Sequence, residues 1–238
     1  MIKPIKRDFK LMRKDRQLYN NIELYTIIKD NDKVRFNEKC NKEALLRYIK
    51  FLEISFEDIW NRCLIDDIFC KSIVMYVAKS ASRQGGKDEK EQLETCNETS
   101  KKLGINIKQL TSKAIRAKKT GTIITQNQMK QLNIKKCECL KSFDAKITGK
   151  MKGYISAKIT YGEGGHQDNV FEELDAMANW WKTFKNESEE YLILLIDTDL
   201  TSRVQNLNEK YEDCHNIKVF NHYKFQDYII RNYSIERT

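Results

Sequence analysis

The sequence contains very little proline and no long apolar run. Its single proline, Pro4, lies too near the start to mark a domain boundary, and there is no internal repeat, low-complexity tract or Pro/Gly-rich linker. The longest candidate apolar run, residues 191–196, has the length of a strand and falls far short of the ~20 residues that a membrane-spanning helix needs. Residues 1–7 are basic but lack the apolar segment of a secretory signal. These absences predict a protein with no membrane partner.

The cysteines do not form a recognisable framework. There are seven, an odd number, and they are scattered along the chain. Only Cys137 and Cys139 lie close together, at a spacing unsuited to a zinc knuckle, and no second Cys/His pair follows to complete one. The pattern is typical of reduced thiols and predicts a cytoplasmic protein.

Positive charge is concentrated in one part of the chain. The formal net charge is +9, yet residues 101–150 hold thirteen Lys and Arg against two Asp and Glu, a local net of +11. Residues 151–200 hold four against ten. A cationic stretch of this strength favours a polyanionic partner such as nucleic acid. The alternative is a lysine-rich surface that is merely solvated.

The first third of the chain has helical periodicity. Residues 43–52 carry apolar side chains at a 3.6-residue rhythm, and residues 73–78 continue the apolar pattern. Between them, Ser55 with Asp58 three residues later resembles a capping box that opens another helix. A polar stretch, residues 80–89, then predicts a loop.

From Leu140 onward the sequence alternates between strand and helix patterns. The expected elements are strands at 140–147 and 154–161, a helix at 170–184 capped by Asp168, a strand at 191–196, a helix at about 202–211, a strand at 217–220 and a helix at 224–232. This order predicts an α/β fold with a mixed β-sheet flanked by helices, behind a helical N-terminal region.

Three side chains in this part have the chemistry that phosphodiester hydrolysis needs. Asp144 is in the first expected strand, Lys158 follows fourteen residues later in the second, and Glu172 follows after another fourteen in the next helix. A hairpin would bring Asp144 and Lys158 side by side. Two carboxylates can hold Mg²⁺, which polarises a phosphate and acidifies a bound water, while a lysine orients that water.

The arrangement resembles the PD-(D/E)xK nuclease superfamily and, within it, the type II restriction endonucleases. The resemblance covers about thirty residues: an acidic residue on one strand, x-x-Lys on the next, and then a helix. Phe143 stands where the family has proline, and Ser156 stands where it has an acidic residue. One branch of restriction enzymes has this Ser-x-Lys and takes the carboxylate from the following helix, as Ser156, Lys158 and Glu172 would allow.

The resemblance implies a restriction-endonuclease-like core and a Mg²⁺-dependent, site-specific cut in double-stranded DNA. It implies that Asp144 and Glu172 bind the metal and that Lys158 assists the attacking water, with Glu163 and Glu173 as alternative ligands. It further implies a homodimer and a cognate DNA methyltransferase that acts on the same site. The whole chain, residues 1–238, would then be one nuclease domain, with a helical DNA-recognition or dimerisation region at 1–100 and the catalytic core at 135–238.

Two polar segments and one basic segment have side chains suited to DNA. Glycines allow a backbone to approach a groove, and Arg, Gln, Asn and His pair with base edges, whereas lysines contact phosphates. The residues that we expect to contact DNA are Arg83, Gln84 and Lys87; Lys113, Arg116, Lys118 and Lys119; and His166, Gln167 and Asn169. Each segment has a plainer interpretation as a solvated loop.

Two other functions remain open. One is a structure-selective repair or junction-resolving nuclease on the same core, which would rely mainly on backbone contacts. The other is a non-catalytic nucleic-acid-binding protein, in which Asp144, Lys158 and Glu172 would be incidental. Such modules usually have a recognition helix or an aromatic RNA-binding strand, and the sequence contains neither pattern.

Overall fold

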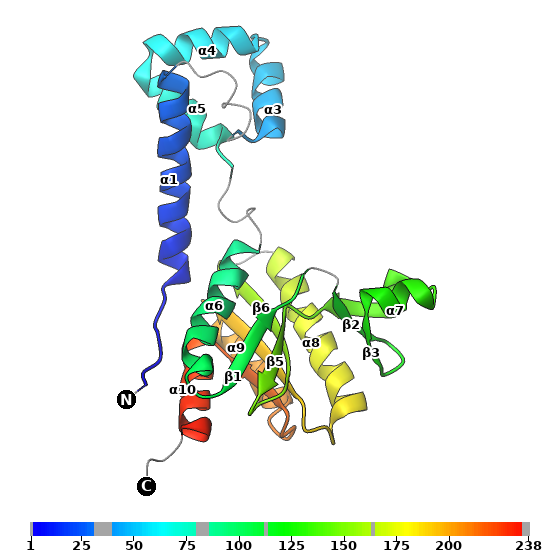
Figure 1. Ribbon diagram of the computed structural model, residues 1–238. Coiled ribbons are helices and arrows are strands. Elements are labelled where there is room, and N and C mark those ends of the chain that lie inside the picture. Colours follow the sequence, from blue (N-terminus) through cyan, green and yellow to red (C-terminus); the bar gives the residue numbers. More distant parts are fainter. Residues whose placement is uncertain (1, 31–39, 80–85, 112–113, 163–164, 235–238) are drawn as a thin grey trace. The chain divides into compact units, whose positions relative to one another are not determined.

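The chain folds into two compact units. The computed structural model describes residues 2–30, 40–79, 86–111, 114–162 and 165–234, and for residues 165–167 the backbone alone. One unit, residues 8–85, is helical; the other, residues 1–7 together with 86–238, is α/β (Figure 1). The helical unit is therefore an insertion near the start of the α/β unit.

The helical unit forms around a small apolar core. Its helices are α1 (Phe9–Lys29), α3 (Lys42–Leu52), α4 (Phe56–Ile65) and α5 (Asp67–Val77). The predicted capping box is confirmed: the Ser55 hydroxyl accepts from the backbone N–H of Asp58 at 3.1 Å, and the Asp58 carboxylate accepts from that of Ser55 at 2.9 Å. Trp60 on α4 is fully buried with Leu24 and Ile28 of α1, which fixes these helices together.

The α/β unit contains the predicted mixed sheet. Its elements are α6 (Lys87–Lys101), β1 (Ile105–Gln109), β2 (Ile115–Lys118), β3 (Ile123–Thr125), α7 (Gln126–Gln131), the short 3-10 helix η2 (Lys136–Glu138), β4 (Cys139–Ser142), β5 (Ala145–Gly149), β6 (Gly153–Thr160), α8 (Gly165–Lys185), β7 (Tyr191–Thr198), α9 (Thr201–Lys210), β8 (Ile217–Phe220) and α10 (His222–Tyr233). The five-stranded sheet has the order β1-β5-β6-β7-β8. Strands β1, β5 and β6 pair antiparallel, whereas β6, β7 and β8 are parallel.

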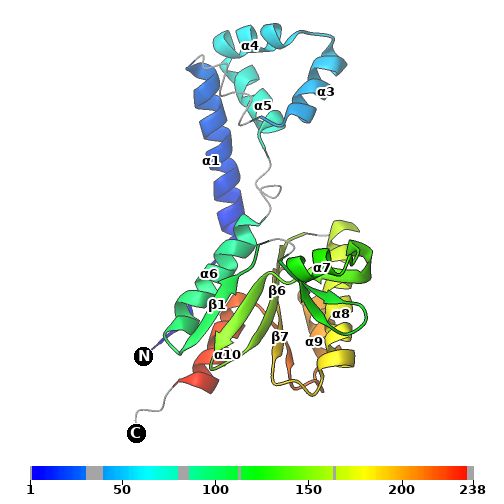
Figure 2. The ribbon, with the colours of Figure 1, turned by 45° about the vertical axis from the view of Figure 1, so that its right-hand side comes forward.

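Helices cover both faces of the large sheet. On one face α6 and α10 pack through Leu93 and Phe225 against Ile193 of the interior strand β7. On the other face α8 and α9 pack through Trp181 and Leu207 (Figures 1 and 2). Because β6, β7 and β8 run in parallel and adjacent order, right-handed crossovers place α8 and α9 on the same side.

A second sheet, of order β3-β2-β4, lies against α8. The indole N–H of Trp180 on α8 donates to the carbonyl of Lys118 on β2 at 2.7 Å. This bond ties the most basic stretch of the chain to the helix that follows the candidate catalytic strand.

Residues 5–7 belong to the α/β unit because they are hydrogen bonded to α10. The Gln226 side chain accepts from the backbone N–H of Ile5 at 2.9 Å and donates to its carbonyl at 3.0 Å. The backbone N–H of Arg7 donates to Nε2 of His222 at 3.0 Å. We call residues 5–7 the N-terminal strap.

The expected strand at 140–147 is two strands. It breaks at Phe143 and Asp144, so that β4 joins the small sheet and β5 the large one. Phe143 turns into the core, where its ring packs 4.6 Å from that of Tyr154. A buried aromatic contact and the change of sheet thus override the continuous strand pattern.

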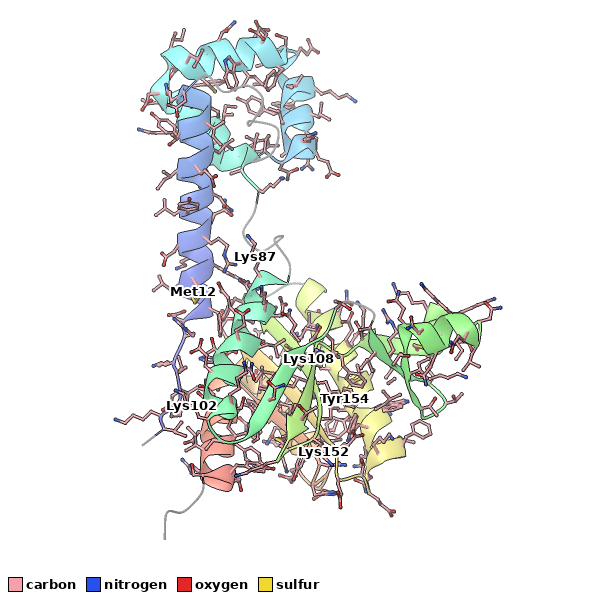
Figure 3. The ribbon with its side chains drawn as sticks, in the orientation of Figure 1. Met12, Lys87, Lys102, Lys108, Lys152 and Tyr154 are labelled. Carbon is pink, nitrogen blue, oxygen red and sulfur yellow. The ribbon has the colours of Figure 1, made fainter. Side chains whose placement is uncertain are left out.

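Two helix boundaries also differ from expectation. Helix α8 begins at Gly165 instead of Val170, and Asp168 forms an ion pair with Arg203 instead of capping it. Helix α6 begins at Lys87, within the expected loop at 80–89; Lys87 and Lys102 mark its two ends in Figure 3. After the inserted helical unit, the α/β unit accordingly resumes at residue 86, and β1, at 105–109, lies before the core predicted at 135–238. No helix in the described ranges combines the length and apolar character needed to cross a membrane.

Candidate active site

Asp144 and Lys158 meet at one end of the large sheet. Asp144 immediately precedes β5, and Lys158 lies near the end of β6, which pairs with β5. Asp144 is held in place because its backbone N–H donates to the carbonyl of Ile155 and its Oδ2 accepts from the backbone N–H of Ala157, both at 2.9 Å. The Lys158 ammonium lies 3.7 Å from the same Oδ2. The structure thus brings this carboxylate and this lysine together as a pair.

The environment disfavours the charged form of Asp144. Burial raises the pKa of its carboxyl above the ordinary value of 3.8, although the Lys158 ammonium and the Ala157 N–H lower it. The negative charge of Glu89 also raises this pKa. A carboxylate that is partly desolvated, next to a cation and near a second carboxylate is a common feature of functional sites.

Helix α6 contributes a carboxylate that the sequence analysis missed. Glu89 lies in the first turn of α6, and its Oε2 accepts from the backbone N–H of Gly86 at 3.2 Å. Because its negative charge raises the pKa of Asp144, we infer that α6 brings acidic charge toward the same end of the sheet. The apolar pattern of the sequence did not indicate this helix, because its buried face is largely polar and has only a few apolar side chains. The buried polar residues are Asp88, Gln92, Thr95, Thr99 and Ser100.

A buried polar network lies behind the pair. Gln92 of α6 is fully buried, and its amide nitrogen donates to Oδ2 of Asp197 at 2.6 Å and to the Lys158 carbonyl at 3.5 Å. The Asp197 carboxylate also accepts from the backbone N–H of His222 at 3.3 Å and lies 2.7 Å from its Nδ1. Since the Arg7 N–H can only donate to Nε2 of His222, the neutral ring carries its proton on Nδ1 and donates it to Asp197. The network links α6 and α10 to the ends of β6 and β7, where Lys158 and Asp197 lie.

The other predicted ligands are less closely associated with the pair. Glu172 is exposed on α8, and Glu173 forms an ion pair with Lys141 at 2.9 Å. Glu163 lies outside the described residues. Among the residues that the structure describes, no three His, Cys, Asp or Glu side chains gather closely enough to hold a metal ion by themselves.

This donor set still fits Mg²⁺. That ion keeps several waters and is commonly bound through one or two protein carboxylates plus the substrate's phosphate oxygens. Asp144 would supply one carboxylate, and Glu89, whose charge acts on Asp144, or the exposed Glu172 could supply a second. A cage of three protein ligands is not required.

The predicted phosphate contacts are not equivalent. Arg116 on β2 is buried, and its guanidinium donates to the Leu140 carbonyl at 2.8 Å, so this side chain is committed to the protein interior and not to DNA. Lys118 is half-buried at the end of β2, and Lys119, which follows it, is exposed. Lys113 lies outside the described residues.

The predicted base-reading residues fall in two places. Lys87 is exposed at the start of α6 (Figure 3), while Arg83 and Gln84 just before it lie outside the described residues. Asn169 is exposed on α8. The backbones of His166 and Gln167 lie in the same helix, and their side chains are not described.

Comparison of the chain with protein-family models, with curated proteins and with solved structures finds no match.

Proposed function

We propose that this chain is a Mg²⁺-dependent endonuclease that hydrolyses phosphodiester bonds at a specific site in double-stranded DNA. The observation that carries the proposal is the Asp144–Lys158 pair, 3.7 Å apart on adjacent strands of a mixed sheet. The burial that raises the pKa of Asp144 supports it because perturbed carboxylates cluster at functional sites, and the net charge of +9 supports it because DNA binding needs an attraction for phosphate.

In the proposed reaction, the carboxylates would bind the metal and Lys158 would act on the attacking water and the phosphate. Asp144 would hold the metal together with a second carboxylate, for which we place Glu89 ahead of Glu172 because the negative charge of Glu89 raises the pKa of Asp144. When bound, Mg²⁺ polarises a phosphate oxygen and lowers the pKa of a coordinated water. The Lys158 ammonium orients the attacking water and offsets the negative charge that develops on the phosphate. The Ala157 N–H holds the Asp144 carboxylate in place, and the Gln92 amide bonds to the backbone carbonyl of Lys158.

The proposal includes a cellular setting. The enzyme would act in the cytoplasm as a homodimer on a palindromic sequence, and a DNA methyltransferase of the same specificity would protect the host sites. Bases would be read by the polar residues near Lys87 and Asn169, and phosphates would be bound by Lys118 and Lys119.

The direct test is incubation of the purified full chain with DNA of varied sequence, such as a phage genome. We expect discrete fragments with Mg²⁺ and intact DNA with EDTA. Asp144→Asn and Lys158→Ala should abolish cutting but leave DNA binding in EDTA unchanged, since both residues act on metal and water. A smear would favour a nonspecific nuclease. Intact DNA under every divalent metal tested, with binding retained, would favour the non-catalytic alternative.

A further inference from the structure

A cavity lies at the ends of β7 and β8, beside the candidate active site. Its volume is ≈ 510 Å³, within the ~300–1,000 Å³ typical of small-molecule sites. Strands β7 and β8 contribute their last residues, and α9 and the start of α10 form the other walls. Crevices at the carboxyl ends of parallel strands are where open α/β sheets commonly bind their ligands.

The cavity shares a face of the sheet with Lys158. Side chains alternate along a strand, and Tyr154 and Ile196 belong to the core under α8 and α9. Lys158 is four residues after Tyr154 and pairs with Ile196, so its side chain leaves β6 on that same face. Val204 and Val219, which line the cavity, pack against or belong to the same core.

The distance between Lys158 and the cavity is one that a few nucleotides of a single nucleic-acid strand can span. The cavity begins one strand beyond β6 and extends to the next, which is ~5–10 Å at the usual strand spacing. Successive nucleotides of a duplex strand advance ~3.4 Å along its axis. A strand whose scissile phosphate lies at Lys158 would therefore present a nucleotide about one to three positions away to the cavity.

The lining has the chemistry of a nucleotide site. Val204 and Val219 provide an apolar wall for a base, and the amides of Gln205 and Asn208 offer donors and acceptors to its edge. Lys224 brings a positive charge for a phosphate. The Asp197 carboxylate also borders the cavity, but its oxygens already accept hydrogen bonds from Gln92 and His222 within the protein.

We propose that this cavity binds one nucleotide unit, with its phosphate at Lys224 and its base between the valine wall and the amides of α9. The nucleotide belongs either to the DNA strand that is cut, in which case the inference rests on the proposed function, or to a free mononucleotide.

Matched variants of exposed residues test the proposal without touching the core. Lys224→Ala is compared with Lys182→Ala, which removes an exposed lysine at the far end of α8, and Asn208→Ala with Asn206→Ala, a neighbour on α9 that does not line the cavity. Binding of a fluorescein-labelled duplex is measured by anisotropy in EDTA, where no cutting occurs. A separate measurement records the melting temperature with millimolar amounts of the four deoxynucleoside 5′-monophosphates.

We expect Lys224→Ala and Asn208→Ala each to weaken duplex binding about fivefold or more relative to their controls. Lys224→Ala should also lower the log–log salt slope by about 0.9, as for one lost phosphate contact. If only the monophosphates stabilise the wild-type protein, and Lys224→Ala removes that effect, the free nucleotide is the ligand. Equal duplex affinity for variants and controls, with no stabilisation by monophosphates, would overturn the proposal. Failure of the wild-type chain to bind duplex would instead count against the proposed endonuclease function. The monophosphate measurement alone would then decide whether the cavity binds a nucleotide.

Discussion

The substitution Asp197→Asn tests the buried network behind the candidate active site. The side chain keeps its shape, but one of its two oxygens becomes an NH₂ group that faces donors. Asp197 accepts from the Gln92 amide, from the His222 backbone N–H and from His222 Nδ1. His222 cannot exchange its ring proton to compensate without losing the bond from the N–H of Arg7.

The expected loss follows from the number of bonds affected. Hydrogen bonds to a charged group contribute about 1.5–3 kcal/mol each, and Asn can retain those on only one oxygen. We therefore expect Asp197→Asn to lower the free energy of unfolding by roughly 2–5 kcal/mol, a large share of the ~5–15 kcal/mol of a typical domain.

Urea unfolding of the full chain, followed by circular dichroism, measures the effect. Asp199→Asn is the matched control: it is the same substitution two residues later, on an exposed carboxylate that accepts from the Gly162 N–H at 2.9 Å, and it should cost less than about 1 kcal/mol. In a double-mutant cycle with His222→Leu, the two losses should fall short of additivity by more than about 0.5 kcal/mol. A small effect of Asp197→Asn, or additive losses with His222→Leu, would refute the network as described.

Three further predictions concern the pair and the sheet. Burial raises the pKa of Asp144 above 3.8, so the charged carboxylate lowers the free energy of unfolding at neutral pH. This loss disappears at low pH, where the carboxyl is protonated in both the folded and the unfolded state. Asp144→Asn should thus melt higher than the wild-type protein at pH 7, with the difference vanishing near about pH 3; equal melting at pH 7 would contradict the assigned burial. Glu89→Gln should reduce Mg²⁺-dependent cleavage at least ~100-fold, and Glu172→Gln should reduce it much less. A larger loss of cleavage for Glu172→Gln would instead identify Glu172 on α8 as the second metal ligand. Gly153→Ala should cost at least ~3 kcal/mol in urea unfolding, because φ is 152° and a Cβ would lie 2.0 Å from a backbone oxygen of β7. Gly86→Ala is the control, because nothing lies within 4 Å of its new Cβ and only the positive φ of 86° is strained, and it should cost only ~1 kcal/mol. Equal losses for the two variants would mean that the close approach of β6 and β7 is not the reason for a glycine at position 153.

The parts of the fold that could be predicted are those in which apolar side chains carry the pattern. The buried run at 191–196 lies in β7, an interior strand between β6 and β8, and the strand at 217–220 has the expected bounds. The capping residues of α4 are local, and a local motif is visible in sequence. The meeting of Asp144 with Lys158 was also predictable, since a hairpin between consecutive strands brings together residues at a fixed spacing.

The parts that were missed depend on contacts made far along the chain. Helix α6 buries polar side chains, and this is possible only because distant partners satisfy them: Gln92 bonds to Asp197, and Thr99 donates to Gln226 at 2.6 Å. An apolar periodicity cannot reveal such a helix, so Glu89 was missed with it. The break at Phe143 depends likewise on the Tyr154 ring, which no local pattern indicates.

The N-terminal strap has a consequence for the order of events during synthesis. Ile5 and Arg7 bond to residues that follow them by 221 and 215 positions. At about 5–20 residues per second, the ribosome needs roughly 10 to 45 seconds to make α10 after the strap has been made. The core of the inserted helical unit is made by residues within 8–85, so this unit can fold in this interval, whereas the strap must wait with its backbone groups hydrated. Docking of residues 5–7 is therefore among the last steps of assembly, and it can take place only after all strands of the large sheet have been synthesised.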